Sequence, residues 1–147
     1  MTSYPDFNRE EMIECLKEFY DLYQHRPVKN NGGGMGPQHM FLTWYAVRKL
    51  NPSTIIESGT YKGAGTWMLE QAAPNATIHS IDPIPSISHS DSYRSDRVQY
   101  HFGEFADFYR IDWDSYIEDK ENCLIFLMII RMHLLEYFSV LPEDLLR

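Results

Sequence analysis

The segment Ile55–Pro83 constrains the fold of this chain more than any other part of the sequence. It reads IIESGTYKGAGTWMLEQAAPNATIHSIDP: a short apolar run, a group of glycines, a stretch with helical spacing, and a second apolar run that ends in an acid. Short β-branched runs are typical of buried strands. Two such strands joined by a crossover helix form the unit from which parallel sheets are built, so the segment predicts an α/β fold.

The rest of the chain continues this alternation. Apolar residues recur at helical spacing over residues 8–24 and 38–50, which predicts two N-terminal helices before the first strand. Strands are expected at 54–57, 77–81, 98–102 and 123–130, with helical segments at 63–73 and 105–109. The order of these elements predicts a parallel sheet with helical cover.

Composition narrows the class of protein. The chain has 147 residues, 44% of them apolar, and a formal net charge of −8, which fits one globular domain and argues against a nucleic-acid or anionic-membrane surface. The first residues lack an apolar signal segment, and two cysteines are too few for a disulfide framework. We therefore expect a soluble, cytoplasmic protein that binds neither nucleic acid nor membrane.

Histidines, cysteines and carboxylates do not stand at metal-ligand spacing, so no metal site is expected. His79 and His101 fall inside expected strands and are interpreted as structural residues. No Ser-His-Asp arrangement is recognisable either, and the catalytic residues stay unknown.

The glycines and the acid of the opening segment indicate a ligand site. Gly59 directly follows a strand, where a glycine lets the backbone turn sharply and lets a ligand lie against it. Gly63 stands at the start of the expected helix, where it permits close packing of helix and strand. Asp82 lies about 20 residues further on, at the tip of the next strand, where a carboxylate can accept hydrogen bonds from a ribose diol.

The glycine spacing distinguishes between nucleotides. The pattern is G-x-x-x-G-x-G preceded by an acid, whereas dinucleotide-binding proteins have G-x-G-x-x-G. It resembles motif I of the class I S-adenosylmethionine-dependent methyltransferases, E/D-x-G-x-x-x-G-x-S/T, which Glu57, Gly59 and Gly63 match. Gly65 departs from that motif because it takes the small or hydroxyl position, and Thr66 follows one place later. The resemblance covers roughly residues 38–130.

The resemblance implies a Rossmann-like fold with S-adenosylmethionine as cofactor, in an incomplete sheet of about four strands. It implies ribose binding for Asp82 and a place beside the adenine for Glu104, while Glu57 would favour the cationic methionine end of the cofactor. The cofactor-binding residues that it implies are Glu57, Gly59, Thr60, Gly63, Asp82 and Glu104.

Structural interpretations of the same residues stay open. Glu57 also fits a cap of the following helix, Asp82 fits the start of a turn, and Glu104 fits a solvated strand end. The glycine-rich loop at residues 32–36 fits either a lid over a ligand or a flexible linker between helices.

Three functions are compatible with these observations. The leading one is a methyltransferase-like protein that transfers a methyl group from S-adenosylmethionine to an unknown small-molecule acceptor. The first alternative is a truncated, non-catalytic cofactor-binding remnant. The second is an NAD-type nucleotide-binding oxidoreductase, which the glycine spacing disfavours. An exposed apolar sheet edge would favour a homo-oligomer.

The expected organisation has three parts. Residues 1–37 form an N-terminal helix and glycine-rich loop, 38–130 the S-adenosylmethionine-binding Rossmann-like domain, and 131–147 a C-terminal tail. The resemblance implies an acid at the end of the fourth strand, but no acid follows Cys123 before Glu136.

A shift of reading frame would explain the missing acid. With plausible third bases, the codons from Phe126 onward encode Phe-Asp-Asp-His in another frame, and the second Asp does not depend on codon choice. We therefore hypothesise that the tail is frame-shifted. Sequencing of the coding DNA tests this hypothesis, and early stop codons in the alternative frame would exclude it.

Overall fold

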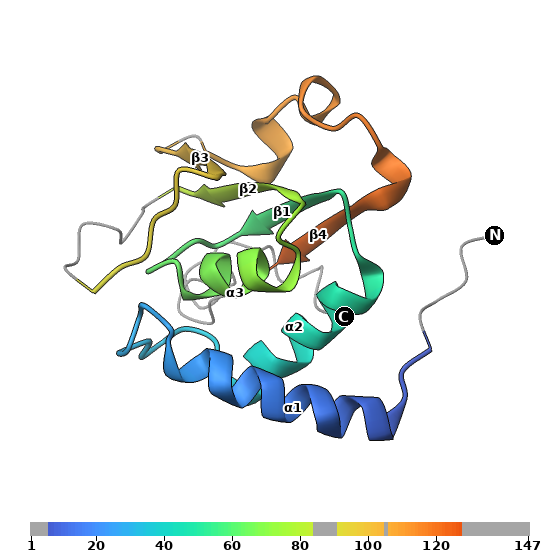
Figure 1. Cartoon of the computed structure of the whole chain (residues 1–147). Coiled ribbons are helices and arrows are strands. Elements are labelled where there is room, and N and C mark those ends of the chain that lie inside the picture. The colour runs from blue at the N-terminus through green and yellow to red at the C-terminus, as the bar shows by residue number, and fades with distance from the viewer. Residues whose placement is uncertain (1–5, 84–90, 105, 128–147) are drawn as a thin grey trace, which may run out of the picture.

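The computed structural model describes residues 6–83, 91–104 and 106–127 (Figure 1). The expected tail at 131–147, the last residues of the expected fourth strand and the hypothesis of a frame shift fall outside these ranges. The helices are α1 (Arg9–Gln24), α2 (Pro37–Leu50) and α3 (Ala64–Ala72). The strands are β1 (Thr54–Ser58), β2 (Thr77–Asp82), β3 (Val98–Phe102) and β4 (Cys123–Leu127).

The four strands form one sheet in the order β3-β2-β1-β4, and every pair is parallel. Thr54 of β1 stands opposite Thr77 of β2 and Cys123 of β4, so the strands begin and end together. This order is that of the central part of a doubly wound Rossmann-like sheet, in which the strand order, but not the strand direction, reverses between β1 and β4. The α/β prediction is therefore confirmed, including the two helices that precede the sheet.

All three helices lie on one side of the sheet, as Figure 1 shows, with α1 packed on α2. Side chains alternate along a strand, so the residues at matching register positions share a face. The apolar side chains on the helix-covered face are Ile55, Ile78, Val98 and Leu124, which join one core cluster with α2 and α3.

The N-terminal helices are fixed at their ends and packed through aromatic rings. Asn8 caps α1 by accepting a hydrogen bond from the Glu11 amide at 3.1 Å, and Pro37 provides the first residue of α2. The Phe19 ring of α1 lies 5.5 Å from the Phe41 ring of α2. Phe19 belongs to the same core cluster as the sheet, so α1 packs directly on the domain.

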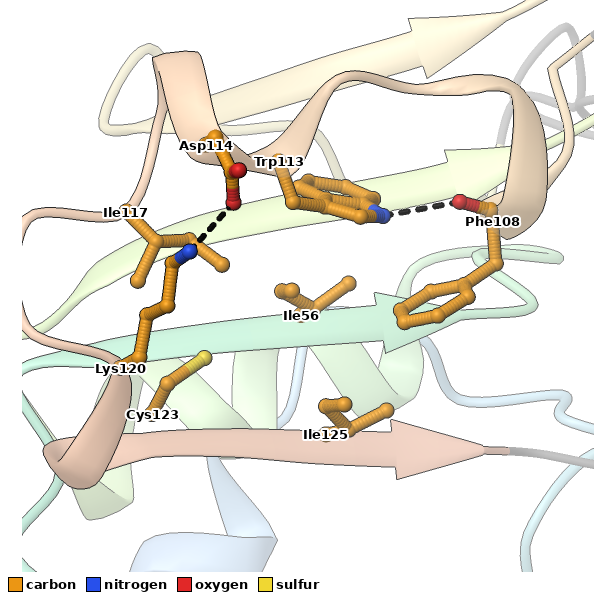
Figure 2. Close-up of a pocket in the computed structure, with 8 residues that line it drawn as sticks. All are labelled: Ile56, Phe108, Trp113, Asp114, Ile117, Lys120, Cys123 and Ile125. Atoms are coloured by element: carbon orange, nitrogen blue, oxygen red, sulfur yellow. Dashed lines mark hydrogen bonds and ion pairs between the residues drawn. The ribbon is translucent and has the colours of Figure 1, made fainter.

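The opposite face is covered by the segment between β3 and β4. Trp113 and Tyr116 meet the rings of His79 and His101 edge-on, with centroids 5.2–5.7 Å apart. Beside them lies a cavity of about 240 Å³ between this segment and the β1 and β4 side chains, including Ile56 (Figure 2). The histidines thus pack in an aromatic cluster with Trp113 and Tyr116.

This covering segment differs from the sequence-based expectation. The single helical turn expected at 105–109 is a 3₁₀ turn at Phe108–Arg110, and two more turns follow at Trp113–Ser115 and Lys120–Asn122. Asp107 and Asp119 begin two of these turns, each accepting hydrogen bonds from backbone amides. Turns this short have no apolar period, which is why the pattern did not predict them.

Among the described residues, none of the helices combines the length and the apolar content that crossing a membrane requires.

Candidate functional site at the carboxyl edge of the sheet

The loop between β1 and α3 needs its glycines for conformational reasons. Gly59 has a φ of 102°, and its amide donates to the Ile81 carbonyl at 2.9 Å, which ties the loop to β2. Gly63 has a φ of 82°, and a Cβ there would collide with the Tyr93 carbonyl oxygen. Left-handed backbone and close approach together favour glycine at Gly63. Both positions match the motif predicted from the sequence, and both are explained without a ligand.

Glu57 is fully buried at the carboxyl end of β1, beneath this loop. Its Oε2 accepts hydrogen bonds from Thr66 Oγ1 at 2.6 Å and from Ser80 Oγ at 2.5 Å. Helix α3 begins after Gly63 and has no side-chain cap. The interpretation of Glu57 as a helix cap is therefore wrong, because the carboxylate accepts hydrogen bonds from side chains of α3 and β2 and not from the first backbone amides of the helix.

A chain of hydroxyl groups extends from Glu57 to the loop. Ser80 Oγ lies 2.7 Å from Thr60 Oγ1. Because Ser80 has one hydroxyl proton and donates it to Glu57, Thr60 donates to Ser80. The carboxylate thus connects β1, β2, α3 and the loop, and a single acid holds the carboxyl edge of the sheet together.

The other carboxylate oxygen, Glu57 Oε1, is buried and has no hydrogen-bond partner among the residues that the structure describes. Burial raises the pKa of Glu57 to about 7, although the hydrogen bonds from Ser80 and Thr66 oppose the shift. Nearby Asp82 and Glu70 raise the pKa further. A buried anionic oxygen without a donor is costly, so a positive charge placed beside it would be stabilised strongly.

Gly65 accounts for the departure from the resembled motif. A Cβ at Gly65 would lie 2.7 Å from Glu57 Oε1, a distance that real Cβ atoms essentially never show. The missing side chain therefore leaves room for the unpartnered oxygen. Thr66, one place later than the motif has its hydroxyl residue, reaches the other oxygen of the same carboxylate.

Asp82 ends β2 beside the same loop and is 7% exposed. Its Oδ2 accepts a hydrogen bond from the Tyr61 amide at 2.8 Å, and Tyr61 takes a positive φ of 48°. Asp82 thus shapes the loop after β1.

Glu104 lies one strand further along the same edge. It is exposed and follows Gly103, which has a φ of 122°. It borders a hollow of about 420 Å³ at the end of β3. The other residues that line this hollow are Tyr100, His101, Phe102, Gly103, Ala106 and Ile111.

The carboxyl edge brings the residues predicted from the sequence into two neighbouring groups. Glu57, Thr60 and the loop glycines form one group with Asp82, through the contacts given above. Glu104 stands apart, at the next strand end, because Phe102 of β3 is the register partner of Asp82.

Two contact residues were missed by sequence reasoning: Ser80 and Tyr61. Ser80 carried a usable signal, since it is a polar residue on the same strand face as Asp82, within an apolar run. Tyr61 carried none, because its role depends on contacts between separate elements.

Comparison with known proteins gives the following similarities. No protein-family model matches the sequence, and no curated protein matches it. Among solved structures, the SAH-bound methyltransferase PaMTH1 of Podospora anserina is 18% identical with a TM-score of 0.44, and covers 70% of this chain and 53% of that one. An SAH-bound O-methyltransferase from Bacillus cereus is 16% identical with a TM-score of 0.47, covering 90% and 60%.

The O-methyltransferase TomG of Streptomyces achromogenes, which is involved in tomaymycin synthesis and was solved with SAM, is 15% identical with a TM-score of 0.49. The match covers 90% of this chain and 59% of that one. The chain therefore spans between 53% and 60% of the length of these three proteins.

Proposed function

We propose that this chain binds S-adenosylmethionine at the carboxyl edge of β1 and β2, and that it belongs to a protein that transfers the methyl group to a small-molecule acceptor. When bound, S-adenosylmethionine supplies an electrophilic methyl group on a sulfonium. The chain's own residues would bind and orient this cofactor, and holding donor and acceptor in line is the main contribution expected of such a site.

One observation carries the proposal: the unpartnered Oε1 of buried Glu57, next to a glycine-rich turn. An anionic oxygen without a donor favours a ligand that brings positive charge. S-adenosylmethionine carries two cationic groups, the sulfonium and the ammonium. Gly59 and Gly65 keep Cβ atoms away from the loop and from the carboxylate, so the backbone permits close approach.

The charge of this edge also favours a cationic cofactor over a dinucleotide. Glu57, Asp82 and Glu104 stand at or close to the carboxyl ends of three neighbouring strands. Lys62 is the basic residue of the loop, and its Nζ lies 3.0 Å from Asp91 Oδ2. A diphosphate would therefore meet carboxylates, and NAD is the less suitable ligand.

Asp82 and Glu104 suit the nucleoside part of the ligand. Asp82 lies between the β1 loop and the β3 end, where a carboxylate can accept from the two hydroxyls of a ribose. The hollow beside Glu104 has about 420 Å³ and aromatic neighbours in Tyr100 and Phe102. Its volume falls in the range of small-molecule sites, and aromatic walls suit a stacked base.

A second candidate is a non-catalytic cofactor-binding protein. One sequence observation favours it: β4 ends without an acid, and none follows before Glu136. In that case the chain binds S-adenosylmethionine but transfers no methyl group.

Isothermal titration calorimetry of the full chain with S-adenosylmethionine, S-adenosylhomocysteine and NAD tests the proposal. We expect both sulfur ligands to bind and NAD to bind much more weakly. Asp82→Asn should weaken S-adenosylmethionine binding by roughly 10- to 100-fold, because hydrogen bonds to a charged acceptor are worth about 1.5–3 kcal/mol.

Asp96→Asn is the matched control, because it removes a carboxylate from an exposed position between β2 and β3. Absence of S-adenosylmethionine binding by folded wild-type protein would contradict the proposal, and stronger NAD binding would favour the oxidoreductase alternative. Binding without methyl transfer to a broad panel of acceptors would favour the non-catalytic candidate.

A further inference from the structure

The glycine-rich segment between α1 and α2 is attached to the loop that follows β1. The Tyr61 hydroxyl donates to the Gly32 carbonyl at 2.9 Å. Lys62 Nζ donates to the Asn30 carbonyl at 3.1 Å. Tyr61 and Lys62 stand between the two glycines of the motif, so the motif loop itself holds this segment in place.

The segment also has an internal fold. The Gly34 amide donates to the Asn31 carbonyl at 2.9 Å, and Asn31 Nδ2 donates to the Met35 carbonyl at 3.1 Å. Gly33 takes a φ of 86°. These bonds form a compact turn that presents Met35 toward the domain, where Met35 packs against the core cluster.

Met35 ends close to the unpartnered oxygen of Glu57. The position of a Cβ on Gly65 would lie 3.9 Å from Met35 Cε and 2.7 Å from Glu57 Oε1. The thioether side chain thus borders the small space that Gly65 leaves open. Met35 offers no hydrogen-bond donor, so it fills that side of the space without satisfying the carboxylate.

We propose that residues 31–36 form a movable cover of this site, that the Tyr61 hydroxyl holds the cover closed, and that Met35 occupies space that the cationic end of the ligand takes. The inference rests on the proposed function, and it resolves the choice between lid and linker in favour of a lid. Binding then requires the Tyr61–Gly32 bond to break and Met35 to move away from Gly65.

The way the segment is held makes this movement feasible. Two side-chain hydrogen bonds attach it to the motif loop, and one of them comes from Lys62, whose Nζ also contacts Asp91. A third bond, from Thr43 Oγ1 of α2 to Met35 Sδ at 3.8 Å, also has to break when Met35 moves. Such bonds contribute about 0.5–1.5 kcal/mol each. Glycines at 32, 33, 34 and 36 lower the conformational barriers to rearrangement. When the cationic end of the ligand takes the space of the Met35 side chain, it also places a positive charge beside Glu57 Oε1.

Tyr61→Phe tests the proposal, because it removes the hydroxyl and keeps the ring. In the unliganded protein, amide hydrogen exchange at residues 32–36 should rise by roughly 2- to 10-fold, the factor that corresponds to one hydrogen bond. Association of S-adenosylmethionine should accelerate and its affinity should increase by a factor in the same range, because the closed form competes with the ligand. Met35→Ala should increase the affinity as well.

Tyr109→Phe is the matched control, since Tyr109 is 90% exposed and lies on the segment between β3 and β4. If Tyr61→Phe leaves amide hydrogen exchange at residues 32–36 unchanged, the Tyr61 hydroxyl does not hold the cover closed. This result would overturn that part of the proposal whether or not the ligand binds. If exchange in Tyr61→Phe is faster but the affinity for S-adenosylmethionine is unchanged or reduced, Met35 does not compete with the ligand for the same space. If wild type and variant both fail to bind S-adenosylmethionine, the proposed function fails, whereas the exchange data still decide whether Tyr61 holds the cover.

Discussion

Glu57 is the residue on which the stability and the chemistry of the edge both depend. Its pKa is raised to about 7 by burial, whereas an ordinary glutamate has a pKa of 4.5. The folded protein therefore binds a proton more tightly than the unfolded chain. Stabilisation from this group is complete below pH 4.5 and is lost as the pH rises toward 7.

Glu57→Gln should remove this pH dependence. The free energy of unfolding of wild type relative to Glu57→Gln should fall by up to about 3 kcal/mol between pH 4.5 and 7, and then stay level. Urea unfolding of both proteins across this range measures the difference. A constant difference would show that Glu57 titrates normally.

Gly65→Ala should destabilise the fold, because the added methyl group would meet the fixed Glu57 Oε1 at 2.7 Å. Overpacking of this kind costs about 1–3 kcal/mol, which exceeds the roughly 1 kcal/mol gained from replacing a helical glycine. Thermal unfolding measures the effect. In a Glu57→Ala background the same change should be neutral or stabilising, and an equal loss in both backgrounds would show that the carboxylate is not the obstacle.

Helix α3 holds the residues that precede β3 through a second buried acid, Glu70. Glu70 is 3% exposed and accepts hydrogen bonds from Tyr93 Oη at 2.7 Å and Ser95 Oγ at 2.8 Å. Its carboxylate and burial together raise the pKa of Tyr93 to about 12. This acid therefore fixes the backbone that packs on Gly63.

Glu70→Ala should lower the free energy of unfolding by about 1–3 kcal/mol, because two partly buried hydroxyl groups lose their acceptor. The Ser95 amide, which donates to Tyr100 Oη at 3.1 Å, should also exchange faster. Chemical denaturation and hydrogen exchange measure these effects. Gln71→Ala is the control, since Gln71 is exposed on the same helix, and equal effects of the two changes would contradict the role of Glu70.

The other sheet face carries a pH-sensitive pair of histidines, one on β2 and one on β3. His79 Nδ1 and His101 Nε2 lie 3.1 Å apart, and burial lowers the pKa of both rings below 6.5. His101 lowers the pKa of His79 further through charge repulsion. The stabilisation from the neutral pair is complete above pH 6.5 and is lost as the pH falls.

NMR titration of the two rings should therefore give pKa values below 6.5 for both. In His101→Asn, the pKa of His79 should move upward and stay below 6.5, because burial is the larger cause of its shift. A value for His79 at or above the ordinary one in wild type would contradict the packing of this pair.

Most elements could be predicted because their residues repeat with a clear period. The strand at 77–81 and the helix at 63–73 were each placed within one residue at either end. The segment at 108–122 could not be predicted, since its turns depend on Asp caps and on rings that meet His79 and His101 across the chain.

The candidate site could be predicted in part. Glu57, Gly59, Gly63 and Asp82 follow from spacing along one strand-helix-strand unit. The contacts that give the site its properties depend on tertiary packing: the hydroxyl chain through Ser80, the open space at Gly65 and the approach of Met35. The spacing of apolar residues along the sequence predicts none of these contacts.

At the scale of the whole molecule, the described residues combine a Rossmann-like sheet, a helical layer on one face and a turn-rich layer on the other (Figure 1). The acids converge because parallel strands end at one edge, beside the position where β1 separates β2 from β4. We propose that S-adenosylmethionine binds at that edge.

NMR of the isotopically labelled full chain, titrated with S-adenosylmethionine, tests whether the cofactor binds at the carboxyl ends of β1 and β2. We predict saturable shifts of the amides of Gly59, Thr60, Gly63 and Gly103, with small or no shifts around Leu16 and Tyr20 on α1. Saturable shifts confined to α1 or to the cavity beside Ile56 would contradict binding at this edge, and so would a spectrum that does not change.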